Sequence, residues 1–175
     1  LREWHPQVPI IAVTATATEK VSNDIVDKLQ LKNVQTFKAT FARDNLAIGV
    51  TLSEEKMDRL MTYLRHVPGS GIIYMRSRKK VEQLARYLNQ QQIVSDYYHG
   101  GLNMKTRMRV QQEWIDNKSR IIVCTNAFGM GVDKPDVRFV IHCDLPPSIE
   151  EYYQEAGRAG RDGRPATANV IINYG

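Results

Sequence analysis

The sequence has little cysteine and no long apolar run, and both absences narrow the classes of protein it can belong to. Among its 175 residues there are two cysteines, Cys124 and Cys143. Two cysteines are too few for a four-cysteine zinc site and give no disulfide framework. Both lie in apolar segments, so we expect reduced core residues in a protein of the cytoplasm. Because no segment could cross a bilayer and no signal peptide opens the chain, we expect no membrane partner.

Sequence patterns for nucleotide binding and for metal binding are also missing. The chain has no G-x-x-x-x-G-K-[ST] loop for phosphates and no G-x-G-x-x-G dinucleotide fingerprint. The missing fingerprint disfavours an oxidoreductase that uses a dinucleotide. No acidic pair stands at the end of an expected strand to hold magnesium, so we expect no metal ligands within the chain.

Size and charge leave room for one large domain and are compatible with a polyanionic partner. The chain is 42% hydrophobic, enough for a buried core, and carries a formal net charge of +5. This charge is compatible with nucleic acid as a partner but is too small to establish one. Because the first residue is Leu1 and not methionine, we expect a segment cut from a longer protein.

Short β-branched runs alternate with amphipathic stretches along the chain. This alternation is typical of an α/β fold with a mostly parallel sheet and helices on both faces. Loops after parallel strands meet at one edge of such a sheet, where ligands bind. We place a domain boundary between a strand–helix–strand piece over 1–42 and a main domain over 43–175. The expected strands cover 8–14, 34–41, 46–52, 71–75, 93–98, 120–124, 137–143 and 167–174; Thr18, Ser53, Ser77 and Ser148 are expected to cap helices, and a further helix to bury Met104, Met108 and Ile115.

The most specific pattern is a pair of arginines that each follow a glycine, in Gly157-Arg158-Ala159-Gly160-Arg161. Their spacing predicts that both guanidinium groups lie on the same side of the last turn of a helix. A guanidinium group binds phosphate oxygens through paired hydrogen bonds and keeps its charge. A basic helix end followed by glycine is the alternative. The repeated Gly-Arg favours a site that neutralises a transferring phosphoryl group, with Arg158 and Arg161 as candidate catalytic residues.

The loop after the strand at 120–124 has features of a phosphate and sugar site. Thr125 offers a hydroxyl and an amide to a phosphate. Asp133 is a short carboxylate that suits a ribose hydroxyl. A plain turn with a solvated Asp133 and Lys134 is the alternative interpretation.

Two other segments follow expected strands and offer groups for a nucleic-acid backbone. The run Arg76-Ser77-Arg78 begins a helix, where amides and guanidinium groups can face an anion. Taken alone, this run is slightly more typical of a solvated helix end. His99 stands before two glycines, and a lone histidine gives no basis for a general-base role. The chain thus has an arginine clamp without a nucleotide cradle, which predicts a partner domain that binds ATP.

Together these residues resemble the second RecA-like domain of RecQ-family DNA helicases, which are superfamily 2 motors. RNA helicases of the DEAD-box type usually carry His-Arg before the first glycine of the arginine motif, so the resemblance favours DNA. Asp44 stands where the family usually has proline, and Gly100 where it has alanine. The matching segments are 12–18 (motif III), 41–46 (the interdomain F-x-R-P-N-L segment), 71–78 (motif IV), 98–102 (Y-H-A-G-L), 127–135 (motif V) and 152–161 (motif VI).

The resemblance implies roles for individual residues. Arg161 is implied to be the arginine finger, with Arg158 beside it on the γ-phosphate of ATP. Asp133 is implied to touch the ribose. The other implied nucleotide-binding residues are Gln154, Gly131 and Gly157, and the implied nucleic-acid-binding residues are Arg76, Ser77, Arg78, His99, Thr125 and Asn126. The family carries its Walker A lysine and magnesium-binding acid in the first domain and a zinc-binding cysteine cluster after the second, so we expect this fragment alone to be inactive.

The function implied is ATP-driven 3′-to-5′ unwinding of DNA in recombination and repair. The implied partners are DNA, as single strands and duplex junctions, and the first RecA-like domain of the same protein. The implied location is the bacterial cytoplasm or nucleoid, or a eukaryotic nucleus. The alternatives are another superfamily 2 motor, either a DNA translocase or an RNA helicase, and a catalytically silent nucleic-acid-binding module.

Overall fold

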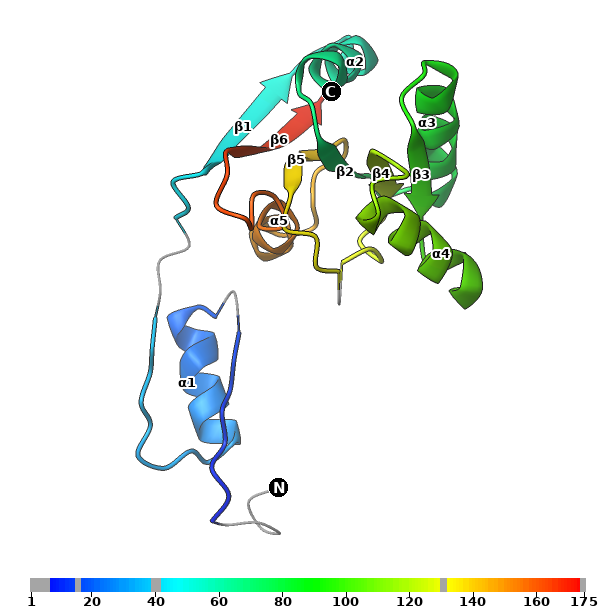
Figure 1. Ribbon diagram of the computed structural model, residues 1–175. Coiled ribbons are helices and arrows are strands. Elements are labelled where there is room, and N and C mark those ends of the chain that lie inside the picture. The colour runs from blue at the N-terminus through cyan, green and yellow to red at the C-terminus, as the bar shows by residue number, and fades with distance from the viewer. Residues whose placement is uncertain (1–6, 15–16, 39–41, 130–131, 174–175) are drawn as a thin grey trace. The chain divides into compact units, whose positions relative to one another are not determined.

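The computed structural model describes residues 7–14, 17–38, 42–129 and 132–173, in two compact units. The first unit covers residues 1–43 and the second covers residues 44–175. The second unit carries the sheet and all the candidate site residues (Figure 1). The assignment of residues 1–42 to a preceding motor domain stays a prediction.

The first unit contains one described helix, α1 (Glu19–Lys28), and none of the strands expected there. Thr18 caps α1 as predicted, because its hydroxyl accepts a hydrogen bond from an amide of the first turn at 3.3 Å. The strands predicted at 8–14 and 34–41 are absent from residues 8–14 and 34–38, and the rest of the second lies outside the described residues. A strand needs a neighbour for its backbone hydrogen bonds. No described strand pairs with these segments, and the side chain of Val13 is 89% exposed.

The second unit is built around a six-stranded sheet in the order β1-β6-β5-β2-β4-β3. Every described strand pair is parallel, as an α/β fold with crossover connections requires. The strands are β1 (Leu46–Leu52), β2 (Ser70–Tyr74), β3 (Ser95–Tyr98), β4 (Ile121–Cys124), β5 (Val137–His142) and β6 (Ala166–Ile172), and the helices are α2 (Lys56–His66), α3 (Arg78–Gln90), α4 (Met104–Ile115) and α5 (Ile149–Ala156).

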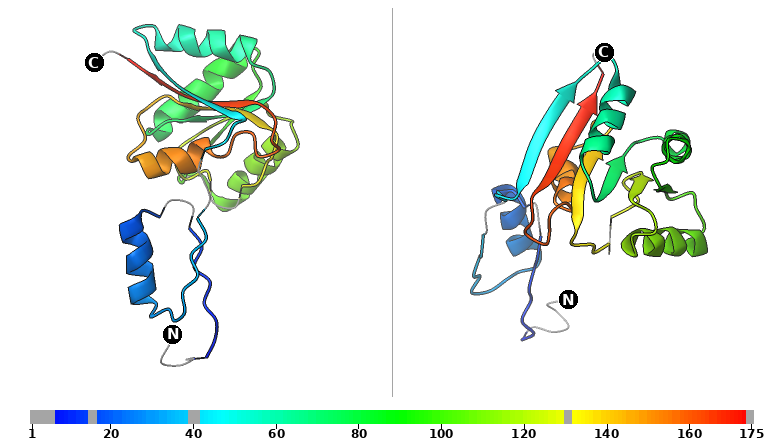
Figure 2. Two further views of the ribbon diagram at one scale, coloured as in Figure 1. Left: turned by 90° about the vertical axis from the view of Figure 1, so that its left-hand side faces the viewer. Right: turned by 45° about the horizontal axis from the view of Figure 1, so that its top comes forward.

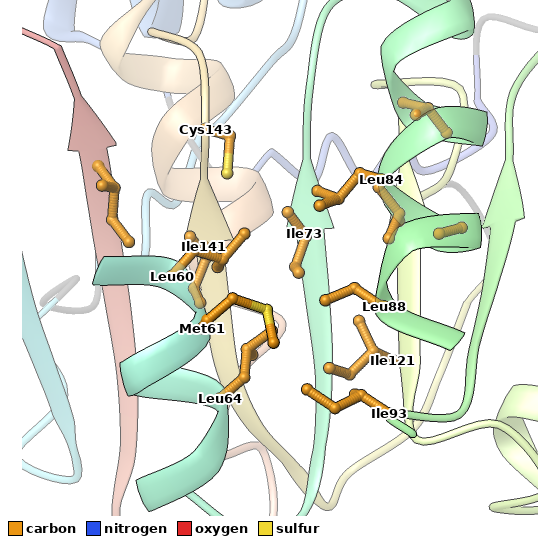
Figure 3. Close-up of a cluster of buried hydrophobic side chains, with 14 of the residues drawn as sticks. Leu60, Met61, Leu64, Ile73, Leu84, Leu88, Ile93, Ile121, Ile141 and Cys143 are labelled. Atoms are coloured by element: carbon orange, nitrogen blue, oxygen red, sulfur yellow. The ribbon is translucent and has the colours of Figure 1, made fainter. Parts of the chain in front are cut away.

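Helices cover both faces of the sheet because successive strand residues point to opposite sides. Ile73 and Ile141 pack against α2 and α3 on one face, in the cluster drawn in Figure 3. Ile72 and Ile122 belong to the cluster on the other face, together with Trp114 of α4. The left view of Figure 2 shows α2 and α3 on one side of the sheet and α4 and α5 on the other. This is the architecture that the sequence predicts.

The predicted helix caps are correct at two of the three positions in this unit. Ser77 and Ser148 accept hydrogen bonds from amides in the first turns of α3 and α5, at 3.4 and 3.1 Å. Ser53 does not cap α2. Its hydroxyl accepts from the Glu55 amide at 3.1 Å, and the helix begins only at Lys56. The serine is therefore part of the turn that precedes the helix.

The buried face of α4 differs from the predicted one. Met104 and Met108 are 69% and 63% exposed, whereas Val110 and Trp114 are buried. Ile115 is half-buried against the same cluster. The two methionines are one helical turn apart, as Val110 and Trp114 are, so spacing alone gives two candidate faces. The large apolar surface of Trp114 decides which face packs on the sheet.

Candidate nucleotide and nucleic-acid site

The loops that follow β2, β3 and β4 lie side by side at the carboxyl edge of the sheet. The Met75 amide donates to the Cys124 carbonyl at 2.9 Å, and the Thr125 amide donates to the Tyr98 carbonyl at 3.1 Å. These bonds continue the parallel ladder past the ends of the strands. They bring together the predicted nucleic-acid-binding residues: Arg76, Ser77, Arg78, His99, Thr125 and Asn126.

Arg76 and Arg78 are exposed cations of this edge, and the exposed Lys79 and Lys80 follow them in the first turn of α3. The Arg76 amide donates to Asp144 Oδ2 at 2.9 Å, which ties the loop after β2 to the loop after β5. A methyl group on Gly101 would lie 3.2 Å from Arg78 Nη1, so this guanidinium group lies beside the loop after β3. Ser77 uses its hydroxyl to cap α3. The two arginines are therefore the guanidinium groups that this edge presents to an anion, with two lysines beside them.

His99 and Thr125 lie below the surface of the same edge. His99 is 5% exposed, and its Nε2 lies 3.2 Å from Glu82 Oε1 while its Nδ1 accepts from the Gly101 amide. Thr125 is 7% exposed, and its hydroxyl accepts from the Ala127 amide at 3.4 Å. Both side chains shape the loops that carry them. Their contact with nucleic acid stays a prediction, as does that of the exposed Asn126.

The two arginines of the Gly-Arg repeat do not lie on a common helical turn, and that prediction is wrong. Helix α5 ends at Ala156 with Gly157 as its C-cap, so Arg158 and Arg161 belong to an irregular turn beyond the helix. We call residues 157–163 the arginine turn. A helix end at this point follows from the glycine at its C-cap position, which disfavours continuation.

Arg158 points into the domain. A methyl group on Gly129 would lie 2.4 Å from its Nη2, so the guanidinium group lies directly against the backbone of the loop after β4. Its Nε is buried without a hydrogen-bond partner. Burial raises the pKa of the neighbouring Tyr74 hydroxyl well above its ordinary value, and the charge of Arg158 opposes that rise. Arg158 thus connects the arginine turn to the loop over 125–136.

Arg161 is the more accessible of the two arginines. Its side chain is 39% exposed, and its Nη1 donates to Asp133 Oδ1 at 3.1 Å. The Asp133 side chain is 81% exposed. The two predicted nucleotide-binding groups are therefore in contact with each other on the surface. Gly131 lies outside the described residues, and Gln154 is exposed on α5.

The arginine turn lies at the amino end of β5, away from the carboxyl edge. The Gly160 amide donates to the Val137 carbonyl at 2.8 Å, and the Asp162 amide donates to the Pro135 carbonyl at 3.1 Å. The expectation that one edge collects the segments at 75–78, 99–101 and 125–133 is only partly correct, because Asp133 lies with the arginine turn. No helix is described in residues 125–129 or 132–136, and this loop runs from the carboxyl end of β4 to the amino end of β5. Its first residues join the edge with Arg76, and Asp133 joins Arg161.

Two buried side chains hold these elements in place, and neither was predicted from the sequence. Lys134 is 4% exposed, and its Nζ lies 2.9 Å from Asn117 Oδ1 and 3.0 Å from Asp136 Oδ1. The interpretation of Lys134 as a solvated charge is therefore wrong. His142 of β5 lies 2.7 Å, through its Nε2, from Glu155 of α5 and fixes that helix to the sheet. No local pattern reveals the contacts of Lys134 with Asn117 and of His142 with Glu155, because these partners are 17 and 13 residues apart in the sequence.

A family model described as the helicase conserved C-terminal domain matches residues 55–163. The chain belongs to this family. The matched range begins before α2 and ends with the arginine turn, so it covers both halves of the site. The predicted sites for nucleotide and for nucleic acid thus lie in a helicase C-terminal domain.

Curated relatives support a more specific resemblance. The RecQ-like DNA helicase blm-1 of Caenorhabditis elegans is 48% identical over 99% of this chain and 18% of its own length. The ATP-dependent DNA helicase RecQ of Haemophilus influenzae is 43% identical over 96% of this chain and 27% of its own length. The predicted resemblance to RecQ-family DNA helicases is confirmed. The chain spans about a fifth to a quarter of the length of these two relatives.

Solved structures confirm the predicted fold class. Saccharomyces cerevisiae Dbp5, bound to RNA and ADP BeF3, matches 93% of this chain and 44% of its own chain with a TM-score of 0.76 at 23% identity. The Escherichia coli DEAD-box protein SrmB, bound to the regulator of ribonuclease activity A (RraA), matches 75% of this chain and 78% of its own chain with a TM-score of 0.64 at 25% identity.

The described part of the chain contains neither a cluster of metal ligands nor a membrane-spanning helix. Within residues 7–14, 17–38, 42–129 and 132–173, no group of three or more His, Cys, Asp or Glu side chains could hold a metal ion. None of the described helices is long and apolar enough to span a membrane.

Proposed function

We propose that this helicase C-terminal domain is the second motor domain of an ATP-dependent DNA helicase. ATP with Mg²⁺ binds mainly to a first RecA-like domain of the same protein, and this domain supplies the arginines. The similarity to relatives named as ATP-dependent DNA helicases supports the proposal. The observation that carries it is the contact of Arg161 with Asp133 at an accessible surface, 3.1 Å apart.

The chemistry of this pair suits a nucleotide. Arg161 pairs with the carboxylate of Asp133 and has five N–H donors in a planar fork, so it can also donate to γ-phosphate oxygens. Asp133 accepts hydrogen bonds and suits the ribose hydroxyls. Arg158 holds the loop behind them through Gly129, and its positive charge adds to the potential at the site. As negative charge spreads over the γ-phosphoryl group, the two guanidinium groups stabilise it.

The carboxyl edge of the sheet suits the backbone of a DNA strand. Arg76 and Arg78 are exposed there, and the caps and loop contacts of Ser77, His99 and Thr125 hold the loops in place. Contacts of cations with phosphates carry little sequence information, so binding is expected to be weakened by salt and nearly independent of sequence. The single loop over 125–136 begins at this edge and ends at the arginine turn. It therefore offers a short route from the nucleotide to the DNA.

The cycle proposed for the full-length protein follows from that route. Closure of the two motor domains on ATP and their opening after hydrolysis move the DNA-binding edge relative to the first domain. Repeated cycles move the protein along one strand in the 3′-to-5′ direction and separate the duplex, in DNA recombination and repair. This activity belongs in the bacterial cytoplasm or the eukaryotic nucleus, wherever the DNA is.

The test uses the full-length protein that carries this domain, with Arg161→Ala. Loss of an arginine finger costs roughly 10³- to 10⁵-fold in turnover. We expect DNA-stimulated ATP hydrolysis to fall by at least about 10³-fold while a fluorescent ATP analogue still binds. The control is Arg109→Ala, because Arg109 is exposed on α4 and pairs only with Glu113 of the same helix. Normal turnover in the Arg161→Ala protein would refute the assignment.

An RNA helicase is the second candidate function. A relative named as an ATP-dependent RNA helicase, R290 of Acanthamoeba polyphaga mimivirus, is 42% identical over 99% of this chain. Strand-separation assays on matched DNA and RNA duplexes decide between the two. Unwinding of the DNA duplex alone supports the first proposal, and unwinding of RNA alone supports the second.

A further inference from the structure

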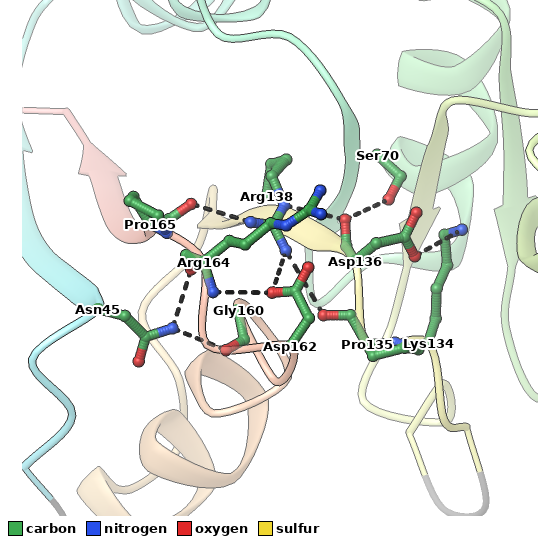
Figure 4. A network of polar contacts seen from close by, with 10 residues as sticks. All are labelled: Asn45, Ser70, Lys134, Pro135, Asp136, Arg138, Gly160, Asp162, Arg164 and Pro165. Atoms are coloured by element: carbon green, nitrogen blue, oxygen red, sulfur yellow. Dashed lines mark hydrogen bonds and ion pairs between the residues drawn. The ribbon is translucent and has the colours of Figure 1, made fainter.

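Asn45 connects the first strand of the sheet to the arginine turn. Its Nδ2 donates to the Gly160 carbonyl at 2.7 Å and to the Arg164 carbonyl at 2.9 Å. Its own carbonyl accepts from the Ala166 amide at 2.8 Å. The partners of these three bonds lie on both sides of Arg161 in the sequence, with Gly160 before it and Arg164 and Ala166 after it. Figure 4 shows the amide of Asn45 directed at Gly160 and Arg164.

The arginine turn is held from two directions. On the β5 side, the Val137 carbonyl accepts from Gly160, and Arg138 Nη2 donates to Asp162 Oδ1 at 2.6 Å. On the opposite side, Asn45 holds the same turn at Gly160. In the sequence, Arg161 lies between Gly160 and Asp162, the two residues that these contacts hold, so its backbone has little freedom to move. Figure 4 shows the contacts at Gly160 and Asp162.

Gly160 shows how closely Asn45 and the turn fit together. Its φ is +61°, in the region that favours glycine. A methyl group there would lie 2.7 Å from Asn45 Nδ2 and 2.9 Å from the Arg164 carbonyl oxygen. The amide of Asn45 therefore occupies space that a side chain at residue 160 would need. The bond from Asn45 to the Gly160 carbonyl is part-buried, so this oxygen needs a donor in place of water, whereas the bond to the Arg164 carbonyl is exposed.

We propose that Asn45 is a positioning residue for the arginine finger, which rests on the function proposed above. Asn45 acts by fixing the backbone on which Arg161 stands, through its bonds to the Gly160 and Arg164 carbonyls.

The decisive substitution is Asn45→Asp in the full-length protein. It keeps the size of the side chain and replaces the donor by an oxygen that faces two carbonyl oxygens. A displacement of about 1 Å in a catalytic group can cost about 100-fold in rate. We expect kcat for DNA-stimulated ATP hydrolysis to fall by about ten- to 100-fold, with the KM for ATP changed by less than about twofold. The first domain still binds the nucleotide, so the loss appears in kcat.

Asn89 supplies a matched control. Its Nδ2 also donates to two carbonyl oxygens, those of Ala85 and Ser95, at 3.0 and 2.7 Å, in a part of the domain away from the arginine turn. Asn89→Asp removes these two hydrogen bonds to Ala85 and Ser95, and it keeps the acceptor that binds the Ser95 amide. Both variants are assayed at a temperature at which thermal unfolding shows them folded. If the role of Asn45 were only structural, Asn45→Asp and Asn89→Asp would lose equal amounts of stability and of kcat.

A double variant separates the inference from the proposed function. If Asn45 acts through Arg161, then Asn45→Asp combined with Arg161→Ala has the kcat of Arg161→Ala alone, within about twofold. Losses that multiply in the double variant overturn the inference, as does a kcat of Asn45→Asp no lower than that of Asn89→Asp. Unchanged turnover in Arg161→Ala alone overturns the proposed function instead, and the inference with it.

Discussion

A single methyl group at Gly129 is expected to move Arg158, because the three atoms nearest to it all belong to that side chain. A Cβ at this position would lie 2.4 Å from Arg158 Nη2 and 3.0 Å from its Cζ. Ordinary contact begins near 3.4 Å, so the guanidinium group must retreat by about 1 Å. Gly129 does not have a positive φ, and alanine therefore fits the backbone. The closest contact that alanine creates is thus the one between the loop and the arginine.

The expected consequence of Gly129→Ala is a loss of turnover. Overpacking of this kind costs about 1–3 kcal/mol of stability. A displacement of about 1 Å in a group that stabilises the γ-phosphoryl charge costs about 100-fold in kcat. The assay is DNA-stimulated ATP hydrolysis by the full-length protein, with denaturant unfolding to measure the free energy of unfolding.

Gly100→Ala is the matched control for this substitution. A Cβ on Gly100 would meet only Ala127 and Arg78 at 3.8 and 3.9 Å, which is ordinary contact. We expect this variant to keep both its stability and its turnover. If Gly129→Ala turns over as fast as Gly100→Ala, then the position of Arg158 does not matter for hydrolysis, and the reasoning fails.

Three further outcomes are expected. Gly160→Ala should lower the free energy of unfolding by about 1–3 kcal/mol, because its φ of +61° is strained for alanine; denaturant titration measures this, and an unchanged midpoint contradicts it. Lys134→Met should cost about 1–3 kcal/mol in the same titration, since the part-buried Ile115 carbonyl and the side-chain oxygens of Asn117 and Asp136 lose a charged donor, and a gain in stability would contradict that reasoning. Burial raises the pKa of the Cys143 thiol from 9.0 to about 12. The raised pKa stabilises the folded state most below pH 9.0, and this contribution is lost as the pH rises towards about 12. Alkylation of Cys143 at pH 8, followed by mass spectrometry, should therefore be slow until the protein unfolds, and rapid labelling of the folded protein would show the thiol to be accessible.

Local sequence patterns predict the parts of the fold that depend on close neighbours. The continuous apolar run at Ile72 and Ile73 indicates a strand buried on both faces, and β2 is such a strand. Ser77 and Ser148 cap their helices because a cap needs only an amide three residues away. The strand expected over 8–14 fails for the converse reason. A short β-branched run indicates a strand only where another strand is there to pair with it.

The candidate site divides in the same way. The spacing of Arg158 and Arg161 identifies them as a pair, and their type identifies phosphate as the ligand. Their directions depend on where α5 ends and on the loop that lies against them. Asn45 donates to a carbonyl 115 residues away, and no local pattern contains that contact.

By itself the sequence determines the alternation of strands and helices, the order of the functional segments and the kinds of charge they carry. These follow from side-chain type and from spacing within a few residues. Only the tertiary structure decides that Arg161 meets Asp133, that Arg158 lies against Gly129 and that Lys134 is buried. The physical reason is that hydrogen bonds and packing act over a few ångströms in space. The parallel sheet determines which distant residues come within that range.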